Sequence, residues 1–308
     1  MNQLKTAVAL IVFNRPESTR RVFAAVAAAR PARLFLIADG PRADRPGDIQ
    51  LCDEVKKIVT AVDWPCQVET DFAAENMGCR PRIVSGLNWV FSQVEEAIIL
   101  EDDCLPDQSF FVFCPELLNR YRHHQQIAFI AGFNPLERSF PFSFSYYYSL
   151  PFSFCTWGWA TWRRAWQEFD ENIRTWPEVK KAGLLELIFK DEKDVKYWSR
   201  IFDQAYEGVG PSAWDYQWDY ACWTRNWLCV VPGRNLIQNI GLGPGATNTL
   251  RADPDRDLPA TALSFPLQHP PAITAWPAYA MKAQKRFYTP NKLWRIRRKL
   301  LLQFRSMR

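Results

Sequence analysis

Histidine and closely spaced cysteine pairs are almost absent from this chain of 308 residues. The only histidines are His123, His124 and His269, and the eight cysteines are irregularly spaced with no Cys-x-x-Cys pair, which argues against a zinc cluster. Glycine is also scarce, at 13 residues, and this excludes collagen-like and glycine-rich repeats. With 48% hydrophobic and 23% charged residues, the composition is that of a globular protein.

The chain has no long apolar run. The run Ala7–Phe13 is short and leads straight into Asn14-Arg15-Pro16, unlike a secretory signal peptide. The longest apolar runs fall short of the about 20 residues that a membrane span needs. Because eight cysteines without an export signal favour a reducing compartment, we predict a cytoplasmic protein.

The excess of basic over acidic residues is confined to the C-terminal end. The whole chain has a formal net charge of +5, but residues 282–308 contain ten Lys or Arg and no acid, so residues 1–281 carry −5. The body therefore lacks the basic surface of a nucleic-acid-binding protein, and we expect no nucleic acid as partner.

The basic tail shows a helical pattern over Asn291–Phe304, with Trp294, Arg298 and Leu301 on one line. This is typical of a basic amphipathic helix that lies on an anionic membrane surface. A solvated or self-docked C-terminal helix is the alternative.

Strand and helix patterns alternate over the first 130 or so residues. The predicted strands are Ala7–Phe13, Arg33–Ala38, Gln67–Thr70, Ala97–Leu100 and Ile127–Ala131. The predicted helices are Ser18–Ala29, Asp48–Ala61, Arg82–Gln93 and Ser109–Tyr121. Such alternation predicts a three-layer α/β/α fold with a mainly parallel sheet.

The second half is rich in aromatic residues. Its predicted elements are a helix over Leu184–Ala205 and strands at Leu228–Val231 and Leu236–Ile237, and Arg251–Pro277 is predicted to be a loop.

Three predicted strands of the first half end in polar groups: Asn14-Arg15, Asp39-Gly40 and the triplet Glu101-Asp102-Asp103. In a parallel sheet, ligands bind outside the carboxyl ends of the strands, so these groups should converge on one crevice. Consecutive carboxylates repel each other unless a cation binds there, and hard oxygen ligands suit Mg²⁺ or Mn²⁺ held against a diphosphate. The alternative is a solvated loop whose Asp107 caps the following helix.

Two tryptophan motifs are the next candidates. Asp215 lies between Trp214 and Trp218, where partial burial would suit a general base. Trp157-Gly158-Trp159 offers indole faces on which a sugar can stack. For both motifs, packing in the core is the alternative. A third segment, Gly241–Thr247, is a candidate lid over a nucleotide, although it lacks the strand-to-helix setting of a dinucleotide fingerprint.

Taken in order along the chain, these motifs resemble the inverting glycosyltransferases of the type-A (GT-A) fold, and in particular the N-acetylglucosaminyltransferase I group and its bacterial homologues. The resemblance spans most of residues 5–250. It implies a nucleotide-diphospho-sugar transferase fold with one catalytic domain, residues 1–281. Within it, residues 1–131 would form the nucleotide-binding half and residues 132–281 the acceptor and catalytic-base half, followed by the tail 282–308.

The resemblance also implies a role for each motif. Asp103 would coordinate the metal and Asp215 would be the catalytic base, while the loop Gln238–Thr249 would cover the donor. The implied donor-binding residues are Arg15 for the nucleotide, Asp39 for uracil, and Glu101 and Asp102 for the ribose and transferred sugar. We also predict that Asn14 binds the donor beside Arg15, and that Trp157, Trp159 and Trp218 shape the sugar pocket.

We therefore predict a metal-dependent inverting glycosyltransferase that uses Mn²⁺ or Mg²⁺. It would move a hexosyl or N-acetylhexosaminyl group from a nucleotide-diphosphate sugar, with UDP favoured by the resemblance, to a glycan or lipid-linked acceptor. Such a role suits cell-surface polysaccharide biosynthesis at the cytoplasmic face of the inner membrane. Two alternatives remain: a non-catalytic carbohydrate-binding protein, and a sugar-nucleotide nucleotidyltransferase. The latter usually needs a glycine-rich loop where this chain has Asn14-Arg15-Pro16-Glu17.

Overall fold

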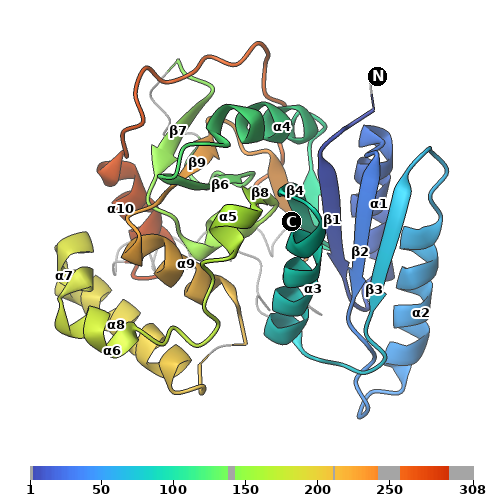
Figure 1. Cartoon of the computed structure of the whole chain (residues 1–308), viewed down its shortest axis with the longest axis horizontal. Helices are drawn as coiled ribbons and strands as arrows, with labels where there is room; N and C mark the ends of the chain where they lie inside the picture. The colour runs from blue at the N-terminus through green and yellow to red at the C-terminus, as the bar shows by residue number, and fades with distance from the viewer. Residues whose placement is uncertain (1–2, 138–142, 211, 242–256, 291–308) are drawn as a thin grey trace, which may run out of the picture.

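An eight-stranded sheet lies between two layers of helices in the computed structural model, which describes residues 3–137, 143–210, 212–241 and 257–290 (Figure 1). The strands are β1 (Ala7–Val12), β2 (Arg33–Ala38), β3 (Gln67–Phe72), β4 (Glu96–Glu101), β5 (Cys104–Pro106), β6 (Ile127–Ala131), β7 (Tyr146–Ser149), β8 (Trp159–Trp162), β9 (Leu228–Pro232) and β10 (Ile237–Asn239). The helices of the first half are α1 (Pro16–Ala29), α2 (Gly47–Thr60), α3 (Cys79–Gln93) and α4 (Phe110–Tyr121). Those of the second half are the 3-10 helix η2 (Ser153–Thr156), α5 (Arg163–Trp166), α6 (Trp176–Lys181), α7 (Leu184–Ile188), α8 (Glu192–Tyr206), α9 (Asp215–Thr224) and α10 (Pro277–Phe287).

The strand order of the main sheet is β3-β2-β1-β4-β8-β6-β9-β7, and β5 and β10 form a separate antiparallel pair. Strands β3, β2, β1 and β4 are parallel neighbours, β8 runs antiparallel to both β4 and β6, and β7 runs antiparallel to β9. Six of the eight strands therefore run the same way, which confirms the predicted mainly parallel sheet.

The apolar runs of the central strands are continuous because both faces of the sheet are covered. In β1, alternate residues such as Val8 and Leu10 pack with α1, α2 and α4 on one face. Their neighbours Ala9 and Ile11 pack with α3 and with helices of the second half on the other face. The predicted three-layer α/β/α arrangement is confirmed by these two cores.

The second half departs from the sequence prediction. The single helix expected over Leu184–Ala205 is two helices, α7 and α8, because the carboxylate of Asp191 accepts a hydrogen bond from the backbone N–H of Lys193 and caps a new helix. Strands β5, β7 and β8 and helices α5, α6 and α10 were not predicted at all. In Figure 1, α6 to α9 gather beside the sheet, away from β1 to β3.

Two predicted segments fall outside the described residues: the tail helix expected over residues 291–304, and the candidate lid beyond Gly241. Within the described ranges, none of the helices combines the length and the apolar character needed to cross a membrane.

Candidate functional site

A cavity of about 660 Å³ opens at the carboxyl ends of β1, β2 and β4. Arg15, Asp39 and all three residues of the acidic triplet line it, so the three polar strand ends do converge as the pattern predicted. Asp215, at the start of α9, lines the same cavity although it is more than 100 residues further along the chain. The site thus combines the parallel sheet of the first half with a helix of the second.

Arg15 supplies positive charge beside the acidic triplet. Its Nη1 lies 3.0 Å from Oδ2 of Asp103 and 3.4 Å from Oδ1 of Asp102. Asp102 is buried and also accepts a hydrogen bond of 3.1 Å from the backbone N–H of Phe13, which follows β1. The guanidinium therefore ties the end of β1 to the end of β4.

The triplet nevertheless holds more negative charge than Arg15 offsets. Burial, followed by the charge of Asp103, raises the pKa of Asp102 to about 7 against the opposing effect of Arg15. The pKa of Glu101 is raised well above its usual range by burial and by the charges of Asp103, Asp102 and Asp215. Asp215, on α9, is therefore close enough to disfavour the ionised form of Glu101 at the end of β4.

A metal ion at this cavity would have to take most of its ligands from outside the protein. In residues 3–137, 143–210, 212–241 and 257–290 there is no group of three or more His, Cys, Asp or Glu side chains that could hold a metal. Asp103 has a side chain that is 19% exposed in the cavity. Mg²⁺ commonly binds one or two carboxylates and completes its shell with waters and substrate phosphates. The side chains present fit an ion of that kind.

The tryptophans of the two motifs separate in the structure. Trp157 lines the cavity and packs against Phe133, with ring centres 4.7 Å apart. Trp159 and Trp218 are 1% and 0% exposed, do not line the cavity, and pack on each other at 5.7 Å. For these two residues the structure shows the core-packing alternative, because Trp159 lies in β8 between β4 and β6.

Gly158 separates the two indoles for a steric reason. It has a φ of +60°, and a Cβ there would lie 2.4 Å from Cδ1 of Ile237. The glycine thus lets the chain turn from the cavity wall into β8.

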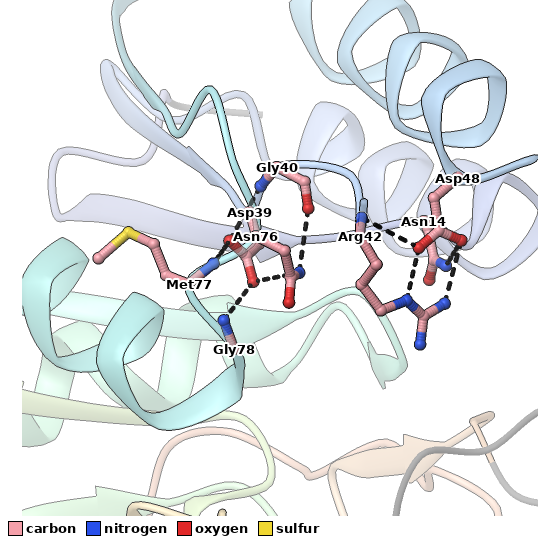
Figure 2. Close-up of polar contacts among 8 residues, drawn as sticks. All are labelled: Asn14, Asp39, Gly40, Arg42, Asp48, Asn76, Met77 and Gly78. Carbon is pink, nitrogen blue, oxygen red and sulfur yellow. Dashed lines mark hydrogen bonds and ion pairs between the residues drawn. The ribbon is translucent and has the colours of Figure 1, made fainter. Parts of the chain in front are cut away.

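Asp39 is surrounded by protein donors. Its Oδ1 accepts hydrogen bonds from the backbone N–H of Gly40 and Met77, and its Oδ2 accepts from the N–H of Gly78 and from the side chain of Asn76, all at 2.8–3.0 Å (Figure 2). The carboxylate therefore fixes the loop that leads into α3, although it also lines the cavity.

Asn14 does not line the cavity. It donates a 2.8 Å hydrogen bond to Oδ1 of Asp48, near the start of α2, and Asp48 also pairs with Arg42 (Figure 2). The hydrogen bond from Arg42, with that from Asn14, lowers the pKa of Asp48 to about 2 against the opposing effect of burial. Asn14 is therefore linked to the cavity through Asp48 and then Arg42, which does line it.

Several lining residues had no clear signal in the sequence. Phe287 and Tyr288 come from the end of α10 and pack on Phe154 of η2, with ring centres 4.6 and 6.1 Å apart. Tyr216 stands inside the Trp-Asp motif and could have been chosen from it. The contribution of α10 depends on how the end of the described chain docks, which no local pattern reveals.

Strand β10 brings Gly241, the first residue of the candidate lid segment, to the triplet. Its partner β5 directly follows the triplet, and the N–H of Ile240 donates a 2.8 Å hydrogen bond to the carbonyl oxygen of Asp103. A Cβ on Gly241 would lie 2.2 Å from Oδ2 of Asp103, so only glycine fits at this position as it stands.

Comparison with known proteins adds little. No protein-family model matches the chain, and no curated protein matches it. Among solved structures, it is similar to the mannosyltransferase PcManGT from Pyrobaculum calidifontis in complex with GDP-Man and Mn²⁺, at 11% identity and a TM-score of 0.30. The match covers 44% of this chain and 37% of the mannosyltransferase. A likeness this slight to a glycosyltransferase decides neither the fold family nor the activity.

Proposed function

We propose that the protein is a metal-dependent inverting glycosyltransferase of the GT-A type. It moves a hexosyl or N-acetylhexosaminyl group from a nucleotide-diphosphate sugar, with UDP favoured, to a hydroxyl of a glycan or lipid-linked acceptor. The observation that supports this most is the meeting of the acidic triplet and Asp215 in one cavity at the carboxyl edge of a mainly parallel sheet.

The triplet side of the cavity is the donor side in this proposal. Asp103 would hold Mn²⁺ or Mg²⁺, which when bound offsets the charge of the diphosphate leaving group. Arg15 stands beside Asp103 and would keep its carboxylate oriented toward the phosphates. Glu101 and Asp102 would contact the ribose and the transferred sugar.

The α9 side is the acceptor side. Asp215 would take the proton from the acceptor hydroxyl as that oxygen attacks the anomeric carbon from the face opposite the leaving diphosphate, which inverts the configuration. Trp157 and Phe154 line the cavity and supply apolar faces on which a sugar ring can rest. Both aromatic side chains would also exclude water from the reacting carbon.

Donor hydrolysis is the most direct test, because it needs no knowledge of the acceptor. A panel of UDP- and GDP-sugars is incubated with Mn²⁺, and release of the nucleoside diphosphate is measured for the wild type, Asp103→Ala and Asp215→Asn. The exposed Asp53→Asn on α2 is the matched control. Turnover by the wild type and the control, with loss in both site variants, supports the proposal, whereas undiminished turnover in both site variants contradicts it.

A lipid-linked acceptor would require the protein to work at the cytoplasmic face of the inner membrane. We propose that the basic tail, residues 282–308, holds it there. Truncation after residue 290 leaves α10 intact and removes most of the tail charge. Flotation with anionic liposomes should be lost on truncation. Equal flotation of both forms, or of neither, would rule out the tail as a membrane anchor.

A further inference from the structure

Three arginines line the cavity, and they differ in how far the protein already uses them. Arg15 is paired with the triplet. Arg82 is buried and donates hydrogen bonds from Nε, Nη1 and Nη2 to the carbonyl oxygen of Ala38, the hydroxyl of Ser85 and the carbonyl oxygen of Asp71. Arg42 is held by one end of its guanidinium only.

Arg42 is fixed in place by a carboxylate that is itself buried. Its Nε lies 2.5 Å from Oδ2 of Asp48 and its Nη2 lies 3.0 Å from Oδ1 (Figure 2). The side chain of Asp48 is 5% exposed and that of Arg42 is 31% exposed. Asn14 donates to the same Oδ1, so the anchor is set before any ligand arrives.

The guanidinium also lies on an aromatic ring at the end of β1. Its Cζ is 5.2 Å from the centre of the Phe13 ring, and Phe13 lines the cavity too. In the part of the chain that the structure describes, Nη1 of Arg42 has no hydrogen-bond acceptor. Arg42 thus offers a ligand two N–H groups and an oriented, planar cation.

Asp39, the residue expected to bind the base, is placed differently. A carboxylate has about four lone-pair positions, and four protein donors already bond to this one. A base N–H could reach Asp39 only by displacing a donor that holds the loop before α3.

We propose that Arg42, rather than Asp39, is the residue that binds the base of the donor nucleotide, with Asp48 and Asn14 as its positioning residues. The guanidinium lies edge-on in the plane of the base, and Nη1 donates to a base carbonyl oxygen. Uracil and guanine carry such an oxygen and adenine does not, so the preferred ligand is a uridine or guanosine diphosphate. This inference rests on the proposed function, because it takes the cavity to be a nucleotide site.

Calorimetric titration of the full chain tests the inference. UDP, GDP, ADP and pyrophosphate are each titrated with Mn²⁺ into the wild type, Arg42→Lys and the double variant Arg42→Met/Asp48→Asn. The lysine variant keeps the charge but loses the second donor edge of the guanidinium, and the double variant leaves no buried carboxylate unpaired. Arg45→Lys, on the same connection but exposed and outside the cavity lining, is the matched control.

The expected result is that the wild type binds UDP or GDP, that both Arg42 variants bind it about tenfold or more weakly, and that pyrophosphate affinity and the Arg45 control are unchanged. If the wild type binds no nucleoside diphosphate, the proposed function fails and this inference with it. If the wild type binds but the Arg42 variants bind equally well, only the role of Arg42 is overturned. An equal loss of pyrophosphate affinity would show that Arg42 acts on the phosphates and would overturn the base contact.

Discussion

Asp39 and the acidic triplet lie at the carboxyl ends of β2 and β4, on either side of β1, and line one cavity, yet the protein treats them in opposite ways. Asp39 accepts four hydrogen bonds from its own chain. In the triplet, Asp102 and Asp103 share Arg15, and the pKa values of Glu101 and Asp102 are raised. An acid that the protein satisfies builds the scaffold, whereas acids left to repel one another favour a cation from outside.

The largest effect should come from Asp215, which lines the same cavity from α9. Asp215→Asn removes the proposed proton acceptor but keeps the size of the side chain. We expect transfer or donor hydrolysis to fall by about 10²–10⁴-fold, with UDP or GDP affinity nearly unchanged. Steady-state rates and calorimetry measure the two quantities. A rate within about threefold of the Asp53→Asn control would remove Asp215 from the reaction.

Asp39→Ala should lower the free energy of unfolding by about 3 kcal/mol. Loss of the buried carboxylate would leave the N–H groups of Met77 and Gly78 without their acceptor. Urea unfolding measures this, with the exposed Asp53→Ala as the control. A loss no larger than that of the control would show that the loop does not depend on Asp39 and would remove the contrast with the triplet.

Asp103→Asn should change stability in the other direction. It removes one of the mutually repelling charges beside Asp102 while keeping an oxygen that can accept from Arg15, so we expect unfolding free energy to stay equal or rise by up to about 1 kcal/mol. The same urea series measures it. A loss as large as that of Asp39→Ala would mean that the triplet is scaffold as well.

A pH-dependent effect concerns Asp48, a second acid that the protein satisfies. Arg42 and Asn14 lower its pKa from 3.8 to about 2, so the folded state gains stability that is present above the unfolded pKa and lost as the pH falls through about 2. The advantage of the wild type over Asp48→Asn should therefore shrink between about pH 5 and about pH 2. Urea unfolding at the two pH values measures it, and a constant difference would contradict the lowered pKa.

The first half of the fold could be predicted because its strands are covered on both faces. Runs such as Ala7–Phe13 and Arg33–Ala38 need no alternation, and their polar ends mark the sheet edge directly. The convergence of Arg15, Asp39 and the triplet on one cavity follows from parallel topology alone.

The second half could not be predicted in the same way, because its burial is decided by partners far away in the chain. Trp159 enters the core since β8 inserts between β4 and β6, and its four residues carry no strand pattern long enough to recognise. Trp218 is covered in turn by Trp159 and Trp166. Trp157 lines the cavity and Trp159 packs in the core, although only Gly158 separates them in the sequence.

Arg42 was missed for a related reason. It lies in a connection, and its position depends on the carboxylate of Asp48 at the start of α2 and on the ring of Phe13 after β1. Neither partner is adjacent in sequence, so only the assembled sheet edge reveals the arrangement.

Metal-dependent nucleotide binding tests the central claim most directly. UDP and GDP are titrated into the wild type and Asp103→Ala with Mn²⁺ and again with a chelator, and the dissociation constants are compared. The account predicts binding that requires both the metal and Asp103. Equal affinity with and without Mn²⁺, or Asp103→Ala binding as tightly as the wild type, would contradict it.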